Sequence, residues 1–390
     1  MAARLAVLGL ALGQTLVWAA LYYLFPALLL AWEEGFGWGR GEIALALTIA
    51  LLVSAGATPL MGRVIDRGYG RLLLTLGAVN GALALSAVSQ VESLSAFYAL
   101  WALIGLAMAA CLYEPCFAYL TRLRGAQART DIMTVTLIGG FASTISFPVG
   151  TGIAAAYGWQ TSVAIFAAIA AGVAAPLFWL CGRVLERKAP ETQAVMASGR
   201  QGGAVRAALA TPAFWMIGFA FSMMALVHGV VINHLLPFLA ERGVAEGTAV
   251  LAASMIGPMQ VAGRVAMISV GRGLPALALA VLSFAGVAAA VLCLLGAGVS
   301  ALLLAGFVVL QGACYGLTSI LRPVVIAETL GRQDFGVISG LLAMPYLASA
   351  AIAPFAGAVA WGAVGYGGAF LAGAGLAVVG AVCIGLARRR

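Results

Sequence analysis

The sequence predicts an all-α membrane protein with twelve transmembrane helices arranged as two six-helix bundles. Hydrophobic residues make up 63% of the chain and charged residues only 9%, with a mean hydropathy of +1.07. Soluble domains carry about 25% charged residues. The apolar runs are continuous rather than alternating, which excludes the strands of a barrel and favours helices that satisfy their own backbone groups. Such a chain needs lipid as its solvent.

Each of the predicted helices is long enough to cross a bilayer, which takes roughly 20 residues. The first continues from Arg4 to about Leu30, so it is too long for a signal peptide. The longest polar interval, 183–211, is rich in charge, Gly, Ser and Gln, and is predicted to link an N-terminal bundle, 1–182, to a C-terminal bundle, 212–390. The helices are expected at about 5–31, 42–61, 72–91, 95–120, 132–156, 160–182, 212–239, 246–268, 275–297, 300–326, 336–358 and 367–387.

Basic residues lie mainly on one side of this topology. With the N-terminus inside, all but four of the 21 Lys and Arg fall in cytoplasmic segments. Arg40 and Arg242 are outside, and Arg264 and Arg322 fall within helices. This asymmetry predicts a multi-pass protein of the cell inner membrane with both termini in the cytoplasm. Lys188 is the single lysine and no basic run carries interleaved aromatics, so nucleic acid is not an expected partner.

The stretch from Gly62 to Arg71 concentrates charge and glycine between two apolar runs. Glycines let helix ends turn tightly and approach closely. A carboxylate at a helix boundary can pair with arginines or with a neighbouring helix N-terminus. The stretch resembles the signature loop between helices 2 and 3 of the major facilitator superfamily, Gly-x-x-x-Asp-Arg-x-Gly-Arg-Arg, with Gly62, Asp66, Arg67, Gly70 and Arg71 in its positions. The alternative is a tight cytoplasmic loop of some other membrane protein.

The resemblance implies the major facilitator fold, a secondary transporter whose two bundles rock about a central site, and a loop that governs cycling. The halves of the sequence also repeat each other, as that fold requires. Gly263–Arg264 echoes Gly62–Arg63, and Glu114–Pro115 matches Arg322–Pro323 in the corresponding helix. A second register, which places Arg272 nearer the position of the loop's acid, stays open.

Two further stretches resemble a narrower branch, the bacterial relatives of the monocarboxylate and oxalate/formate transporters. Residues 34–43, Glu-Gly-Phe-Gly-Trp-Gly-Arg-Gly-Glu-Ile, are similar to the segment before helix 2 of that branch, and Pro258–Arg264 is similar to its arginine-bearing helix 8. That arginine holds the substrate carboxylate in monocarboxylate carriers, so the resemblance implies that Arg264 binds a small organic anion. The chain departs from the branch at Gln260, where the branch has an acid, and it lacks the Asp-Gly-Gly-Trp signature before helix 1.

Arg264 is a candidate on physical grounds too, because a charge inside a membrane helix is unfavourable and marks a functional site by default. The alternative is a side chain that extends to the lipid headgroups. Four other side chains at membrane depth are candidate substrate contacts, and the resemblance implies that helices 1, 4, 7 and 10 line the cavity. Packing is the alternative for each of them. They are Tyr22, His228, Gln260 and Tyr315.

Glu114 and Arg322 occupy matched places before prolines in helices 4 and 10. We expect them to form a charge pair that closes the cytoplasmic side, since a lone charge at membrane depth is unfavourable. Opening would separate the pair and favour protonation of Glu114, which would couple transport to protons. The alternative is that each side chain faces the headgroups on its own.

No pattern for catalysis, nucleotide binding or metal binding is present. The six cysteines lie in or at the ends of apolar runs without a histidine at ligand spacing, and there is no Walker loop. We therefore expect no enzyme activity, no cofactor and no metal. The expected partners are a small anionic substrate, the proton and the lipid bilayer, and the expected form is a monomer.

The sequence thus predicts proton-coupled transport of a small organic anion such as a monocarboxylate. The alternative is proton-driven efflux of drugs or amphipathic metabolites. Residues 147–152 half resemble the Gly-Pro-x-x-Gly-Gly motif of drug/proton antiporters, but Phe147 stands in place of the first glycine. A cavity with arginines favours anions, whereas one with only acids and aromatics favours cationic drugs. A membrane receptor is disfavoured, because no soluble domain exceeds the central loop.

Overall fold

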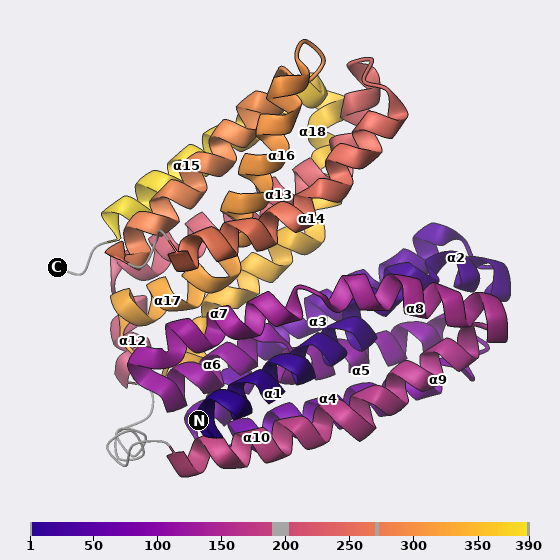
Figure 1. Cartoon of the computed structure of the whole chain (residues 1–390), viewed down its shortest axis with the longest axis vertical. Coiled ribbons are helices and arrows are strands. Elements are labelled where there is room, and N and C mark those ends of the chain that lie inside the picture. The colour runs from indigo at the N-terminus through magenta and orange to yellow at the C-terminus, as the bar shows by residue number, and fades with distance from the viewer. Residues whose placement is uncertain (1, 189–202, 270–272, 388–390) are drawn as a thin grey trace. The chain divides into compact units, whose positions relative to one another are not determined.

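The computed structural model describes residues 2–188, 203–269 and 273–387, and this part of the chain contains helices and no strand (Figure 1). The chain divides into two compact units. Unit 1 comprises Met1–Val205 and Arg332–Met344, and unit 2 comprises Arg206–Gly331 and Pro345–Arg390. The two units are described separately.

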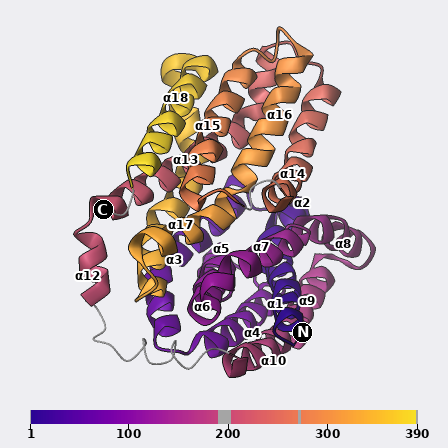
Figure 2. The same cartoon turned by 60° about the vertical axis from the view of Figure 1, so that its left-hand side comes forward.

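Unit 1 is built mainly from the first half of the chain. In this unit α1 packs against α7 and α10, and α3 packs against α5, as Figures 1 and 2 show. Its elements are α1 (Ala2–Trp18), the π-helical turn η1 (Ala19–Tyr23), α2 (Leu24–Phe36), α3 (Arg40–Asp66), α4 (Gly70–Val88), α5 (Leu94–Cys111), α6 (Tyr113–Arg124), the 3-10 turn η2 (Gly125–Gln127), α7 (Ala128–Gly139), α8 (Ala142–Tyr157), α9 (Trp159–Ile169), the π-helical turn η3 (Ala170–Ala174) and α10 (Ala175–Lys188).

Unit 2 is built from the second half, with two elements that also contribute residues to unit 1. These are the short α12 (Gly203–Leu209) and the long α18 (Phe335–Leu386), whose residues up to Met344 belong to unit 1. Within unit 2, α14 packs against α16, and α15 packs against α16 and α17. Its other elements are α13 (Pro212–Glu241), α14 (Glu246–Ser269), α15 (Ala276–Leu295), α16 (Ala301–Gly316) and α17 (Thr318–Leu330).

Ten stretches of the described residues are long and apolar enough to cross a membrane. Two of them, Leu94–Gly139 with 46 residues and Phe335–Leu386 with 52, are far longer than the roughly 20 residues of one span. Each contains a glycine at positive φ, Gly125 at 52° and Gly365 at 69°, a backbone conformation that glycine adopts without steric cost. The chain turns there. With these turns, every one of the twelve predicted helices has a counterpart, and the all-helical fold class is confirmed.

Three details differ from the sequence prediction. The interval 183–211 is not all loop, because α10 extends to Lys188 and α12 is helical from Gly203, while residues 189–202 of this predicted linker lie outside the described residues. The expected helices 95–120 and 300–326 are each interrupted. Leu112 has extended dihedrals (φ −80°, ψ −158°) between α5 and α6, and Leu317 separates α16 from α17. Proline explains the first interruption, because Pro115 has no N–H to donate to the Cys111 carbonyl one turn earlier.

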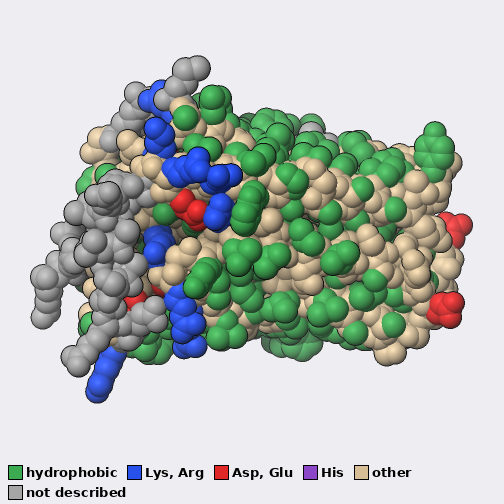
Figure 3. All heavy atoms as spheres, turned by 90° about the horizontal axis from the view of Figure 1, so that it is seen from below, with side chains coloured by type: hydrophobic (Ala, Val, Ile, Leu, Met, Phe, Trp, Pro, Cys, Tyr) green, Lys and Arg blue, Asp and Glu red, His purple; other side chains and the backbone are tan. Residues whose placement is uncertain are grey.

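The surface agrees with a chain that has lipid as its solvent. On the face drawn in Figure 3, hydrophobic side chains cover much of the molecule, and Lys and Arg side chains gather toward one end. Large apolar residues such as Leu83, Leu180 and Leu282 are more than half exposed. A soluble protein rarely exposes contiguous apolar surface on this scale, so these helices are suited to contact with lipid tails.

Candidate functional site

Four polar or aromatic side chains meet inside unit 2. His228 of α13 stacks on Tyr315 of α16, with ring centroids 3.4 Å apart and planes 8° from parallel. Gln311, one turn before Tyr315, places Nε2 at 3.0 Å from Nδ1 of His228. An amide nitrogen only donates, so Nδ1 accepts and the ring proton is on Nε2. The hydroxyl of Tyr315 lies 3.4 Å from that of Tyr346 in α18. Three helices therefore position this group.

Arg322 of α17 extends the group with a positive charge. Its guanidinium carbon lies 4.2 Å from the ring centroid of Tyr346, and the residue is only 5% exposed. A cation over an aromatic face gains more when it is desolvated. We call His228, Gln311, Tyr315, Arg322 and Tyr346 the unit 2 cluster. It combines one buried cation with several groups that can donate hydrogen bonds.

Arg264 lies at the break between α16 and α17. Its Nε donates to the carbonyl oxygen of Gly316, the last residue of α16, at 2.9 Å, and the residue is 8% exposed. Gln260, one turn earlier on α14, packs against Gly316, where a side chain would overlap it. The break frees carbonyl groups, and Arg264 satisfies one of them. Its buried side chain disfavours the alternative of an arginine that extends to the headgroups.

Asp66, in the loop stretch of unit 1, caps the first turn of α18. Its Oδ1 accepts a hydrogen bond from the backbone N–H of Gly336 and its Oδ2 one from Val337, both at 2.9 Å. A carboxylate at a helix N-terminus satisfies N–H groups that lack helical partners and complements the helix dipole. Arg122 of α6 donates to the backbone carbonyl of Asp66. Gly62 and Gly336 approach so closely that neither has room for a side chain. The expected contact with a neighbouring helix N-terminus is confirmed.

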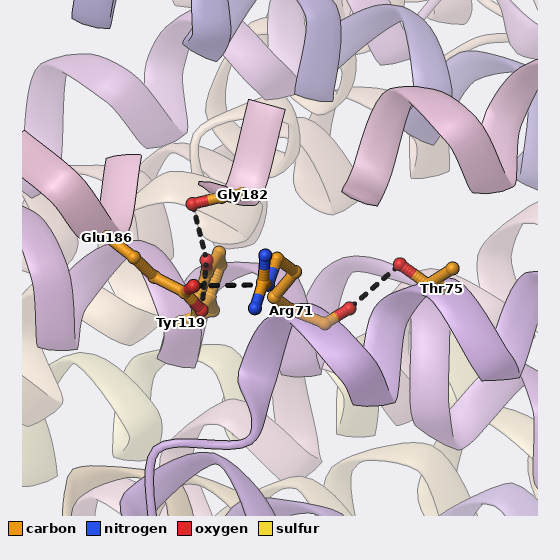
Figure 4. Close-up of polar contacts among 5 residues, drawn as sticks. All are labelled: Arg71, Thr75, Tyr119, Gly182 and Glu186. Atoms are coloured by element: carbon orange, nitrogen blue, oxygen red, sulfur yellow. Dashed lines mark hydrogen bonds and ion pairs between the residues drawn. The ribbon is translucent and has the colours of Figure 1, made fainter. Parts of the chain in front are cut away.

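Arg71, at the end of the same stretch, joins α4 to α10 (Figure 4). Its Nε lies 3.1 Å from Oε2 of Glu186, and its guanidinium lies 4.1 Å from the ring centroid of Trp179. The Tyr119 hydroxyl of α6 lies 3.1 Å from Oε1 of Glu186 and 3.2 Å from the carbonyl oxygen of Gly182. Gly70 packs on the Tyr119 ring without room for a side chain, whereas Arg67 is exposed. The loop stretch is thereby tied to two helices remote in sequence.

Comparison with known proteins decides the family. The model of the family described as "Major Facilitator Superfamily" matches residues 10–276, which is more than half of the chain. The chain belongs to the major facilitator superfamily. It is therefore a multi-pass membrane transporter and not an enzyme.

Solved structures of major facilitator proteins share the fold along nearly the whole chain. The proton:xylose symporter XylE has a TM-score of 0.75 at 12% identity, covering 97% of this chain and 94% of its own. The fucose:proton symporter FucP of E. coli has 0.71 at 14%, and the human organic anion transporter MFSD10 has 0.71 at 16%, each covering 98% of both chains. No curated protein sequence matches the chain. At such identities the likeness concerns the fold alone.

The remaining predicted residues of this major facilitator protein are distributed over both units. Tyr22 lies half-buried in η1, where its ring meets the edge of Trp18 with centroids 5.2 Å apart. Glu114 is half-buried in the first turn of α6 in unit 1, whereas Arg322 belongs to unit 2, so their pairing stays a prediction. Arg272, which the second register of the internal repeat places near the position of the loop's acid, lies outside the described residues.

Several residues of these sites escaped sequence reasoning. Glu186 could have been noticed as the one acid in the basic stretch 183–188. Trp18 shares a helix face with Gln14 and Tyr22 at a spacing of four, and Tyr113 directly precedes Glu114. Partners remote in sequence, such as Arg71 and Trp179, leave no local signal at all.

Proposed function

We propose that this major facilitator protein transports a small organic anion, monocarboxylate-like, across the inner membrane by alternating access and with proton coupling. The observation that carries the proposal is the burial of two arginines, Arg264 and Arg322, in membrane-spanning helices of unit 2. A buried guanidinium is costly, and an anionic ligand is one reason to keep it. A guanidinium also binds a carboxylate through two parallel hydrogen bonds.

The side chains around these arginines suit a carboxylate. His228, whose Nε2 carries the ring proton, and the hydroxyls of Tyr315 and Tyr346 supply further donors, and Arg322 adds charge beside them. Gln260 adjoins Arg264 through Gly316. In this proposal Arg264, His228, Gln260 and Tyr315 contact the substrate in unit 2, and Tyr22 is a separate candidate in unit 1.

Proton coupling and orientation are further parts of the proposal. Glu114 is the proposed proton carrier because it lies half-buried at the interruption of a membrane-spanning helix. Both termini are proposed to be cytoplasmic because basic residues concentrate on that side of the topology. XylE and FucP are proton symporters by name, which is support by analogy of fold.

Thermal stability of the purified protein tests the substrate charge, because a ligand that binds the folded state raises its stability. The probes are propionate, propionamide and propylamine, which have similar size and different charge. We expect a rise in melting temperature with propionate alone, and loss of that rise in Arg264→Ala. A rise with propionamide and propionate alike would contradict the anion proposal.

The alternative, efflux of drugs or amphipathic metabolites, is favoured by one observation in unit 1. The half-buried rings of Trp18 and Tyr113 contact each other, and Tyr113 directly precedes Glu114 in the sequence. Aromatic faces with an acid suit organic cations. In that case tetraphenylphosphonium would stabilise the protein and carboxylates would not, and Glu114→Gln would abolish the effect.

A further inference from the structure

Unit 1 contains two aromatic clusters, and the first shows how rings pack in this protein when they serve only the core. Phe25, Trp32, Phe97 and Trp101 meet edge to face, with the centroids of Phe25 and Trp101 at 4.5 Å and 90° between the planes. None of the four is more than 2% exposed. Such pairs stabilise a core beyond their buried area.

The second cluster, which we call the Trp18 cluster, has similar ring geometry and different exposure. Trp18 lies 4.8 Å from Tyr113 and 5.2 Å from Tyr22 between ring centroids, and Tyr22 lies 5.0 Å from Tyr23. All four residues are half-buried. The rings of the first cluster are shielded from their surroundings, whereas these four leave part of their surface accessible to a ligand.

The depth of Trp18 excludes an aromatic belt at the lipid headgroups. Trp18 is about 14 residues after Arg4 and about 15 before Glu33, so at a rise of about 1.5 Å per residue it lies roughly 21 Å from each. Belt residues occur at the ends of a span, not at its middle. The exposed faces of the cluster therefore lie at membrane depth.

A fully buried amide beside these rings has an unused acceptor. Gln14 is 0% exposed, and its Nε2 donates at 2.7 Å to the Cys111 carbonyl that Pro115 leaves without a helical partner. Its Oε1 has no hydrogen-bond partner among the described residues. Indole N–H groups in both clusters also lack partners within the described part of the chain, so they do not distinguish the two clusters, whereas the Gln14 oxygen does. A buried acceptor left unsatisfied is destabilising, and a donor on a ligand would remove that cost.

Irregularities of the backbone position the rings of the Trp18 cluster. The π-helical turn η1 carries Tyr22 and Tyr23, and such turns are frequent at functional sites. The extended residue Leu112 interrupts the helix directly before Tyr113, and interrupted membrane helices commonly form binding sites. Gly139 of α7 leaves space for the Tyr113 hydroxyl, where a side chain would overlap it. Three separate elements thus converge on one cluster.

We propose that the Trp18 cluster, with Gln14 beside it, is a subsite for a flat conjugated ring, so that the transporter binds an aryl carboxylate more tightly than an aliphatic one. This inference rests on the proposed anion transport and names its substrate class. Aromatic faces stack on a flat ring better than on a puckered one, and Gln14 Oε1 accepts from a hydroxyl or amino group on that ring. Aromatic pairs of this kind correspond to an affinity gain of roughly two- to tenfold.

The test compares binding of five probes to the full-length protein in detergent: 6-hydroxy-2-naphthoate, 2-naphthoate, uncharged 2-naphthol, cyclohexanecarboxylate and D-xylose. We expect 2-naphthoate to bind about tenfold more tightly than cyclohexanecarboxylate, and the hydroxyl to add a further gain that Gln14→Leu removes. Trp18→Leu and Tyr22→Leu should each reduce the preference for the aryl ring to about twofold or less. Trp361→Leu, at a tryptophan of unit 2 that is 48% exposed, is the control and should leave the preference unchanged.

The outcomes separate this inference from the proposed function. Three outcomes overturn the subsite: equal affinity for 2-naphthoate and cyclohexanecarboxylate, an aryl preference that survives Trp18→Leu and Tyr22→Leu, or binding of xylose alone. Arg264-dependent binding of both carboxylates without an aryl preference leaves anion transport standing and removes only the subsite. Uncharged 2-naphthol could instead bind as tightly as 2-naphthoate and lose that binding in Trp18→Leu. That result supports the subsite and contradicts the proposal that the substrate is an anion.

Discussion

Three arginines of unit 2 show how surroundings decide what a guanidinium can do. Arg242 is exposed beside Phe238, with its guanidinium carbon 5.0 Å from the ring centroid. Arg322 makes a similar contact with Tyr346 in a buried place, and Arg264 is buried at a helix break. Water can solvate the first charge, so its ring contact contributes little. The other two are held where a charge is costly without a function.

Replacement of Arg264 by lysine should remove most transport although the charge is kept. Lysine cannot reproduce the planar fork that binds a carboxylate through two bonds, nor the bond from Nε to Gly316. Uptake of a labelled carboxylate into proteoliposomes is the measurement. Arg264→Ala should also lower the free energy of unfolding by about 0.5–1.5 kcal/mol, because the Gly316 carbonyl loses one of its two donors and keeps the longer bond from the Ser319 hydroxyl at 3.3 Å.

Arg242→Lys is the control for this prediction, since it makes the same substitution at an exposed arginine of the same unit and should leave uptake unchanged. Full uptake in Arg264→Ala would mean that the side chain serves only the helix break. The melting temperature of each variant shows whether a loss of uptake is caused by a loss of folding.

At the scale of elements, interrupted helices mark both units. α5 and α6 separate at Leu112, and α16 and α17 separate at Leu317. In each case a side chain from another helix bonds a carbonyl near the break: Gln14 bonds Cys111, and Arg264 bonds Gly316. Backbone groups at membrane depth need such partners, because lipid offers none. The breaks are thus stabilised features of the fold.

Pro115→Ala should restore helical hydrogen bonding across the first break. The new N–H can donate to the Cys111 carbonyl, which displaces the Gln14 amide and changes how Tyr113 faces Trp18. We expect thermal stability to stay equal or rise while uptake falls several-fold. Pro212→Ala, at the first position of α13, is the control, because a proline there interrupts no helix. Unchanged uptake in Pro115→Ala would show that the break has no part in transport.

The stretch from Gly62 to Arg71, predicted to be the signature loop of the superfamily, should govern cycling and not affinity. Asp66→Asn keeps a side chain that caps helices well, but it removes a charge worth about 0.3–1 kcal/mol at a helix N-terminus and one of two acceptors for α18. We expect uptake to fall several-fold while binding in detergent stays within a few-fold. Asp131→Asn, which alters a carboxylate paired with Arg124 in the same unit, is the matched control.

The opposite pattern for Asp66→Asn, with binding lost and the fold intact, would place Asp66 in the substrate site. Binding and uptake both unchanged would show that the cap on α18 has no role in the cycle. The two measurements on one variant therefore distinguish a gate from a binding residue.

At the scale of the whole molecule, the fold was readable from the sequence and the sites only in part. Apolar runs of membrane length predict helices because lipid leaves the backbone no other choice. Asp66 was foreseeable from its place at a helix end. Trp18 was not, because a ring of the proposed subsite and a core ring such as Trp101 look alike in sequence and differ only in exposure. The partners of Arg71 and Arg264 lie far along the chain, and one is a backbone carbonyl.

The predicted pairing of Glu114 with Arg322 is tested by charge exchange. We expect Glu114→Arg and Arg322→Glu each to abolish most uptake, and the double exchange to restore a measurable part of it. A pair that interacts gives non-additive effects. The exchange of Glu92 with Arg242, two exposed residues, is the control and should change little. Additive losses in the double variant would contradict the gate.

The assignment of residues 332–344 to unit 1 has a consequence for how the protein forms during synthesis. Gly62 and Asp66 have their contacts with Gly336 and Val337, so α3 cannot acquire them until the ribosome has added more than a hundred residues beyond α10. At about 5–20 residues per second, that delay is roughly 8–30 s. During this interval the Asp66 carboxylate and the face of α3 at Gly62 lack their contacts with α18. Ribosome-bound chains stopped after residue 385 should therefore protect a cysteine placed at Thr58, a buried residue of α3 whose backbone packs against Gly340, from thiol reagents, and chains stopped after residue 300 should not.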